Sequence, residues 1–505
     1  MRGLGGWWHV LGRYGKRVAM VPVVAAVLLI AVAAGLGVGF GVTALTQRLA
    51  AVSAAASAVA PPAPVVPHPA LRSVTADGPA PTPAGVGAVL DPLVAAGGLG
   101  SLSGQVVDPA TGAVLWQRHP ADALVPGSTA KLLTASAALL TLDHQQRFHT
   151  TVLAGPDPAT VVLRGGGDPT LSGAAQGTET GYPGAARLDD LVSQVRAAVP
   201  GPIRRVLVDV SRYTGDALAP SWLPADVAGG YIAPIEPVML DGGRADPQQD
   251  ISPRAAKPAT AAAAELARRL GADPDTVTLG SAAPGAAVLG DVSSPTVQDL
   301  VATALRQSDN VLAETLAREV ARKTGAQPSF AGASQAVLTV LRRHGFDVNG
   351  ATLVDGSGLS TSDAVPATLL TALLGTAAAP DQPAATAGGP GSQTTASGAG
   401  NQPTDGVNQP PTAALRPLLV GLPVAGGSGT LADRYRDSSG ASARGRGWVR
   451  AKTGTLTGVN SLAGTVLDTD GRMLVFALLS NGPNPALVRP RLDALAAELR
   501  SCGCH

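Results

Sequence analysis

Residues 18–45 form a run of 28 positions without a charged side chain, and this run limits what the chain can become more than any other feature. An apolar helix of that length can span a lipid bilayer. Basic residues precede the run, which favours a cytoplasmic amino terminus over residues 1–17. We therefore expect a single-pass cell-membrane anchor, with everything after it folded outside the cytoplasm. The alternative is a cleaved signal peptide and a secreted protein, although the apolar region of a signal peptide normally has only about 7–15 residues.

Two segments are too rich in Ala, Pro, Gly and Ser to form a core. Residues 46–88 follow the apolar run, and we expect a disordered, extended stalk there. Residues 377–412 lie between two apolar stretches, so we expect a disordered loop within a folded domain. The rest of the 505-residue chain is still longer than one hydrophobic core usually serves, which predicts two folded domains.

Charge and cysteine content narrow the classes of partner. Lysine and arginine total 37 against 36 acidic residues, so the chain offers no basic field for a nucleic-acid backbone, and we expect no nucleic-acid partner. Cys502 and Cys504 end the chain with too few neighbouring ligands for a zinc site, which leaves a local disulfide or free thiols. Two histidines, His144 and His149, are too few ligands to indicate a metal site, so we expect structural roles for them and neither a metal nor a cofactor.

The residue patterns mix strands with helices. Residues 102–120 carry two alternating runs around a Pro-Ala-Thr-Gly turn and predict a β-hairpin. Residues 448–483 alternate in the same way, which predicts two or three antiparallel strands, and residues 485–500 predict a closing helix. Helices are expected near Leu90 and between these ends. The sequence thus predicts an α+β domain whose sheet joins both ends of the folded region.

A serine and a lysine stand three positions apart at the start of an apolar helix predicted over residues 128–141. Residues i and i+3 share one face of a helix, so Lys131 can reach the hydroxyl of Ser128. Burial can remove the proton of a lysine and make it a general base, while the helix amino terminus favours a developing oxyanion. The alternative is an ordinary helix cap beside a solvated lysine. Of the five lysines in the chain, only Lys131 has a serine three positions before it.

Two further motifs share the chain with this pair. Ser308 and Asn310 flank an aspartate in "SDN", where we expect one helix to end and another to begin. The tripeptide "KTG" occurs twice. At Lys323 it ends a long helix with a glycine where a cap falls, which indicates helix termination only. At Lys452 it leads into alternating strands, so we assign Lys452 to the functional motif.

The order Ser-x-x-Lys, Ser-Asp-Asn, Lys-Thr-Gly is the order found in serine acyltransferases that attack D-amino-acid amides or β-lactams. Together with residues 163–173, 354–360, 422–434 and 449–464, these motifs resemble the class C low-molecular-mass penicillin-binding proteins. These are the D-alanyl-D-alanine carboxypeptidase/endopeptidases of peptidase family S13. The resemblance covers roughly residues 88–500.

The resemblance implies an architecture. It implies an α+β, β-lactamase/transpeptidase-like domain, in which helices flank an antiparallel sheet, formed by residues 89–147 and 287–501. A smaller domain, residues 148–286, is inserted between the first and second motifs. The sequence separation between Ser128 and Ser308 is much longer than the separation of about 60 residues that the resemblance implies for a class A β-lactamase.

The resemblance also implies roles for the first two motifs. Ser128 is the acylated nucleophile and Lys131 its base. Ser308 relays a proton to the leaving amine, and Asn310 orients the substrate amide.

For the third motif, the resemblance implies substrate binding. Lys452 and Thr453 would bind the terminal carboxylate of the substrate, and Lys452 would also support Ser308 electrostatically. Gly454 is expected to belong to the same substrate-binding group. The backbone N–H groups of Ser128 and Thr455 would form the oxyanion hole.

These features predict a serine-type D-Ala-D-Ala carboxypeptidase/endopeptidase that hydrolyses peptidoglycan stem peptides and cross-links. Its expected partners are stem peptides ending in D-Ala-D-Ala, β-lactam antibiotics as inhibitors, and the cytoplasmic membrane through the amino-terminal helix. Two alternatives remain open: a β-lactamase, and a catalytically silent cell-wall-binding protein of the same fold.

Overall fold

The computed structural model describes residues 79–380, 411–437, 439–482 and 484–504. The anchor predicted over residues 18–45, most of the predicted stalk and most of the predicted loop over 377–412 lie outside the described residues. Across the described ranges, no helix is long and apolar enough to cross a membrane.

The first helix corrects the predicted end of the stalk. Helix α2 spans Pro83–Ala95 and therefore begins inside the segment predicted to be disordered up to residue 88. Thr82 caps this helix, because its side chain accepts a hydrogen bond from the backbone N–H of Gly85 at 3.1 Å. Pro83 occupies the first helical position, where its missing N–H costs nothing.

A five-stranded antiparallel sheet joins the two ends of the folded region, which confirms the predicted α+β class. Its order is β10-β11-β12-β1-β2. The predicted hairpin supplies two strands, and the carboxyl-terminal region supplies three: β1 (Ser101–Val107), β2 (Val114–Arg118), β10 (Arg450–Leu456), β11 (Val459–Leu467) and β12 (Met473–Asn481). Strand β1 pairs with β12 in antiparallel register from Ser101 opposite Asn481 to Val107 opposite Val475.

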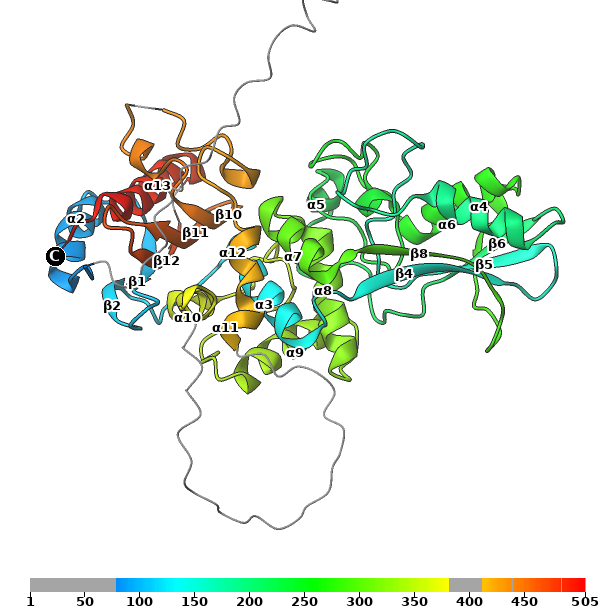
Figure 1. The fold of residues 1–505 in the computed structure, drawn as a ribbon, viewed down its shortest axis with the longest axis horizontal. Coiled ribbons are helices and arrows are strands. Elements are labelled where there is room, and N and C mark those ends of the chain that lie inside the picture. The colour runs from blue at the N-terminus through cyan, green and yellow to red at the C-terminus, as the bar shows by residue number, and fades with distance from the viewer. Residues whose placement is uncertain (1–78, 381–410, 438, 483, 505) are drawn as a thin grey trace, which may run out of the picture. The chain divides into compact units, whose positions relative to one another are not determined.

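Both faces of the sheet are buried. Alternate side chains of a strand point to opposite sides, so each strand contributes to two separate cores. On β12, one set packs with α2 and with the closing helix α13 (Pro485–Ser501): Leu474, Phe476 and Leu478. The other set packs into a helical core: Val475, Ala477 and Leu479. Figure 1 shows α2 and α13 beside the sheet. The chain ends just beyond α13, where Cys502 and Cys504 form a disulfide.

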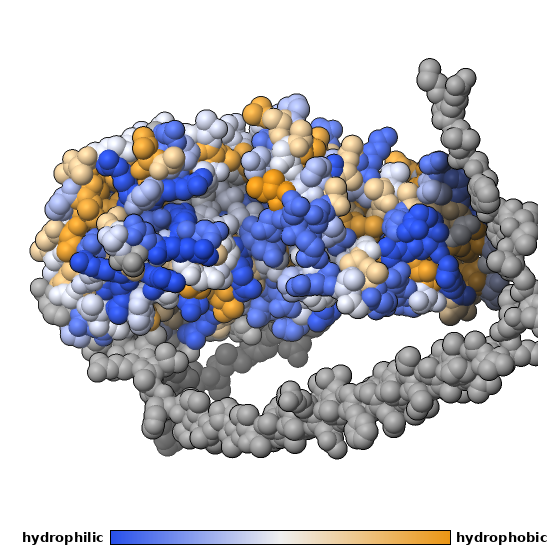
Figure 2. Space-filling model, turned by 90° about the horizontal axis from the view of Figure 1, so that it is seen from above, coloured by the Kyte–Doolittle hydropathy of each residue, from blue (hydrophilic) through white to orange (hydrophobic). Residues whose placement is uncertain are grey.

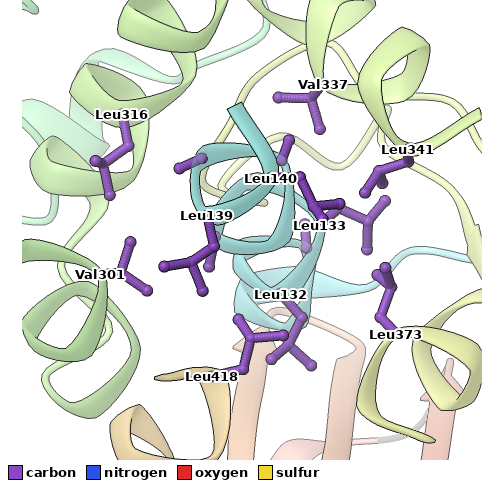
Figure 3. Close-up of a cluster of buried hydrophobic side chains, with 14 of the residues drawn as sticks. Leu132, Leu133, Leu139, Leu140, Val301, Leu316, Val337, Leu341, Leu373 and Leu418 are labelled. Carbon is purple, nitrogen blue, oxygen red and sulfur yellow. The ribbon is translucent and has the colours of Figure 1, made fainter. Parts of the chain in front are cut away.

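Helix α3 (Lys131–Thr141) lies at the centre of that helical core. Its leucines meet apolar side chains from the surrounding helices, including Val301, Leu316, Leu341 and Leu418 (Figure 3). These helices are α7 (Val297–Arg306), α8 (Asn310–Lys323), α9 (Phe330–Arg343), α10 (Ala367–Ala378), α11 (Pro411–Leu415) and α12 (Pro417–Gly421). A two-stranded ladder joins β3 (Ala123–Leu124) to β9 (Val365–Pro366). Because α3 is enclosed on all these sides, its amino-terminal turn is held in a fixed place.

A second sheet is formed by residues between α3 and α7. Its order is β7-β6-β5-β4-β8, from β4 (Arg147–Ala154), β5 (Thr160–Arg164), β6 (Arg205–Asp209), β7 (Thr278–Leu279) and β8 (Val288–Thr296). Helices α4 (Leu188–Ala198) and α6 (Pro258–Leu270) share its apolar core, and α5 (Pro224–Ala228) lies in a connecting loop. Strand β8 pairs antiparallel with β4, so this sheet extends to Thr296, beyond residue 286, where we placed the end of the inserted domain. We call residues 147–296 the insert.

The surface of the described chain is mostly hydrophilic in the view of Figure 2, where hydrophobic side chains are scattered in small groups.

Candidate active site

The first motif lies on a short 3₁₀ turn, Gly127–Ala130, that leads directly into α3. Gly127 has a φ of 52°, a conformation that glycine adopts without steric cost. Lys131 follows one turn after Ser128, and its Nζ lies 3.0 Å from Ser128 Oγ. The predicted pair therefore stands in direct hydrogen-bonding contact.

Lys131 is fully buried, although it carries an amine. Its Nζ donates to Asn310 Oδ1 at 2.5 Å and to Ser357 O at 2.8 Å. Burial lowers the pKa of Lys131 to about 8, against the opposing field of carboxylates led by Asp355 and Glu314. A neutral amine that gives its two hydrogens to these oxygens keeps its lone pair for the hydroxyl hydrogen of Ser128. This arrangement suits a general base.

The second motif connects α7 to α8, as the sequence predicted. Ser308 has a φ of 59°, which is rare for a residue other than glycine. Asp309 caps α8 by accepting a hydrogen bond from Leu312 N at 2.9 Å. The chain reversal points the Ser308 hydroxyl at the third motif, where Ser308 Oγ lies 2.9 Å from Lys452 Nζ.

The third motif lies on β10 and contains a second buried amine. Lys452 Nζ also donates to Thr453 O at 2.8 Å. Burial, and then the charge of Lys131, hold the pKa of Lys452 well below its usual range. The other "KTG" lies at the carboxyl-terminal end of α8. Lys323 is the exposed last residue of that helix, and Gly325 follows it at a φ of 78°. The structure thus places Lys452, and not Lys323, beside the other two motifs.

Strand β10 presses against the nucleophile turn at Gly454. A Cβ at this position would lie 2.2 Å from Ser461 Oγ, 2.4 Å from Pro126 O and 3.0 Å from Ser128 N, so only glycine fits. A Cβ on Gly127 would in turn lie 3.2 Å from Thr455 N. The backbone N–H groups of Ser128 and Thr455 therefore belong to two segments in close contact, as an oxyanion hole requires.

These motifs open into one cleft of about 1140 Å³. Its lining includes five of the predicted site residues: Ser128, Ser308, Asn310, Thr453 and Thr455. Thr430 also lines the cleft, and its hydroxyl lies 2.7 Å from that of Thr453. Lys131 and Lys452 are buried behind this wall, and each contacts a serine that lines the cleft. The insert contributes another part of the cleft wall, with Tyr231, Arg244 and Arg254.

The loop at residues 354–360 positions one partner of Lys131, which our motif analysis did not foresee. Asp355 accepts hydrogen bonds from the backbone N–H groups of Ser357 and Gly358 at 3.0 and 2.7 Å. Glu314 accepts from Gly356 N at 3.0 Å, and burial raises the pKa of Glu314 to about 8. The two carboxyl groups hold the loop that presents the Ser357 carbonyl to Lys131. The loop segment was noticed only through its family resemblance.

The two histidines have ordinary partners. His144 Nε2 lies 2.9 Å from Leu139 O. His149 Nδ1 lies 2.9 Å from Asp291 Oδ2, on a strand far away in the sequence. Among the residues that the structure describes, no cluster of His, Cys, Asp and Glu could hold a metal ion.

Known proteins are similar to this chain in both sequence and fold. The model of the D-Ala-D-Ala carboxypeptidase 3 (S13) family matches residues 87–251, 245–388 and 407–500. Carboxypeptidase DacB of Mycolicibacterium smegmatis is 45% identical over 478 residues, which cover 92% of this chain and 97% of that protein. The D-alanyl-D-alanine carboxypeptidase of Actinomadura sp. strain R39 is 28% identical over 497 residues, covering 80% of this chain and 82% of that protein. The crystal structure of penicillin binding protein 4 (dacB) from Haemophilus influenzae superposes with a TM-score of 0.60 at 19% identity, covering 83% of this chain and 99% of that one.

Proposed function

This chain belongs to the D-Ala-D-Ala carboxypeptidase 3 (S13) family, and from that premise we propose that it is a serine peptidase that cleaves the terminal D-Ala-D-Ala bond of peptidoglycan stem peptides. The observation that carries this proposal is a buried lysine amine 3.0 Å from the hydroxyl of Ser128, at the wall of a cleft. Such a pair supports covalent acyl transfer, because the base and the nucleophile are already in contact.

In the acylation step, Lys131 Nζ takes the hydroxyl proton while Ser128 Oγ attacks the carbonyl carbon of the penultimate D-alanine. The N–H groups of Ser128 and Thr455 stabilise the oxyanion of the tetrahedral intermediate. The C–N bond then breaks, and Ser308 relays the proton that Lys131 accepted to the leaving amine, which returns Lys131 to its neutral form. Free D-alanine departs, and the rest of the stem peptide remains as an ester on Ser128.

The terminal carboxylate of the substrate is proposed to bind between Lys452 and the hydroxyls of Thr453 and Thr430. Burial, and then the charge of Lys131, hold the pKa of Lys452 well below its usual range. An incoming carboxylate supplies a counter-charge and favours the ammonium form. Substrate binding would thus place a positive charge on Lys452 beside Ser308, where it supports the proton relay electrostatically.

Deacylation reverses these roles with water as the nucleophile. A water molecule loses a proton to the site's base and attacks the ester carbon, and Ser128 Oγ leaves and is reprotonated. The same chemistry applied to a cross-linking amide releases the amine of a neighbouring stem peptide, which is the endopeptidase reaction.

We further propose that the reaction takes place outside the cytoplasm, on a protein anchored by residues 18–45. The uncharged run and the basic residues before it support this proposal.

The fate of labelled penicillin on the full-length protein tests this function. We expect a long-lived covalent adduct and release of D-alanine from a pentapeptide. Rapid turnover of the penicillin would instead indicate a β-lactamase, and no reaction with either compound would indicate a silent protein of the same fold. Parallel assays on a cross-linked dimer measure the endopeptidase activity.

A further inference from the structure

The middle residue of the second motif, Asp309, is held by the insert. Its side chain is 1% exposed, and Asp309 Oδ2 accepts from Arg244 at 2.7 Å and from the Tyr182 hydroxyl at 2.8 Å. Arg244 also donates to Tyr182 Oη at 2.6 Å, which closes a three-membered network. Arg244 is itself only 5% exposed. A charge pair so deeply buried costs a great deal to break, because removal of one partner leaves the other charged group without compensation.

This network acts on a strained segment. Ser308 holds a φ of 59°, a backbone conformation that persists in a serine only when its surroundings fix it. Asp309 is fixed on both sides, since Oδ1 caps α8 through Leu312 N and Oδ2 is held by the insert. In this conformation the hydroxyl oxygen of Ser308 lies 2.9 Å from Lys452 Nζ.

The insert also contacts the third residue of the motif. Asn310 Nδ2 donates to the backbone carbonyl of Tyr231 at 2.9 Å, while Asn310 Oδ1 accepts from Lys131. This contact fixes which way the amide faces the cleft. Arg254 ties the two insert loops together, because it donates to Gly230 O at 3.0 Å and to Gly242 O at 2.7 Å.

We propose that Arg244 and Tyr182 are positioning residues for catalysis: through Asp309 they hold Ser308 and Asn310 in the orientation that the reaction uses. The insert is then part of the catalytic apparatus as well as a wall of the cleft. The expected effect on acylation rests on the proposed function. The expected effect on the backbone of residues 307–312 rests only on the contacts described above.

Arg244 and Tyr182 form one clamp on α8 through Asp309, and the insert carries a second clamp that again joins an arginine and a tyrosine to one carboxylate. The second clamp provides a matched control. Arg212 and Tyr213 bind Glu319, ten positions after Asp309 on α8: Arg212 donates to its two oxygens at 2.8 and 2.6 Å, and the Tyr213 hydroxyl donates at 3.0 Å. This clamp joins the insert to the same helix but contacts none of the three motifs. Its loss should weaken the junction without turning Ser308.

The test compares two pairs of variants in the full-length protein. Arg244→Lys is matched with Arg212→Lys, and Tyr182→Phe with Tyr213→Phe. The melting temperature of each variant reports the structural loss. Rapid-mixing kinetics with penicillin separate the limiting acylation rate from the dissociation constant of the initial complex, and amide hydrogen exchange follows residues 307–312.

We expect the limiting acylation rate to fall by about tenfold or more in Arg244→Lys and by about threefold or more in Tyr182→Phe, with the dissociation constant changed by less than about twofold. The Arg212→Lys and Tyr213→Phe rates should stay within about twofold of the parent protein at a similar loss of melting temperature. Exchange over 307–312 should accelerate only in the first member of each pair.

Equal loss of acylation within each matched pair, or unchanged acylation and exchange in Arg244→Lys, would overturn the inference. The exchange arm decides it even if the parent protein fails to react with penicillin, which would instead refute the proposed function. Unchanged exchange over 307–312 in both Arg244→Lys and Tyr182→Phe would by itself reject a positioning role.

Discussion

Acylation should depend steeply on pH below 8 and only weakly above it, because Lys131 must lose a proton before it can accept one from Ser128. The pKa of Lys131 is about 8, lowered from 10.5 chiefly by its burial. A lowered lysine pKa means that raising the pH converts the ammonium to the neutral base within the working range. The neutral fraction is about 1% at pH 6, about 9% at pH 7, about 50% at pH 8 and about 90% at pH 9.

The acylation rate should follow these fractions. We expect it to rise about tenfold between pH 6 and pH 7, about fivefold from pH 7 to pH 8, and less than twofold from pH 8 to pH 9. A lysine at its ordinary pKa would instead give a tenfold rise per unit through the whole interval. The two cases differ most between pH 8 and pH 9.

The assay measures stopped-flow acylation by a chromogenic β-lactam at saturating concentration, with circular dichroism at each pH as the folding control and spontaneous hydrolysis subtracted. A rate independent of pH from 6 to 9 would show that Lys131 does not act as the base. A continuing tenfold rise above pH 8 would show that burial does not lower its pKa as the contacts require.

Two further predictions test the third motif and the packing of the site. Lys452→Ala should reduce acylation by roughly 100-fold or more, because the carboxylate loses its cation and Ser308 its polarising neighbour, whereas the exposed Lys323→Ala should leave labelling kinetics unchanged; the reverse result would reassign the motif. Gly454→Ala should destabilise the fold by roughly 1–3 kcal/mol and slow acylation, since its Cβ would lie 2.2 Å from Ser461 Oγ, and a variant with unchanged melting temperature and rate would contradict that packing.

The parts of the site that the sequence could predict are those encoded locally. Ser128 and Lys131 meet because three residues make about one helical turn, and that relation needs no tertiary information. The break at residues 308–310 was predictable because Ser, Asp and Asn favour caps, and Asp309 does cap α8. The α+β class followed from strand patterns at the two ends of the folded region, which β1 and β12 join.

The remainder depends on contacts between distant segments. Nothing near Arg244 in the sequence indicates that it binds Asp309, and Trp222, whose Nε1 donates to Asp355 Oδ2 at 2.8 Å, is equally far from its partner. The boundary of the insert was misplaced for the same reason, because the antiparallel pairing of β8 with β4 leaves no local mark on either strand. The catalytic roles of the motif residues stay predictions that the experiments described here test: Ser128, Lys131, Ser308, Asn310 and Lys452.

The most direct test of the account is to locate the acyl group. Full-length protein is reacted with penicillin, quenched, digested and mapped by mass spectrometry, with Ser128→Ala treated in parallel and checked by circular dichroism. The account predicts one penicilloyl group per chain, attached to Ser128, and no adduct on a folded Ser128→Ala variant. An adduct on Ser308 or on any other residue, or labelling of Ser128→Ala at the parent rate, would contradict the central claim that Ser128 is the nucleophile.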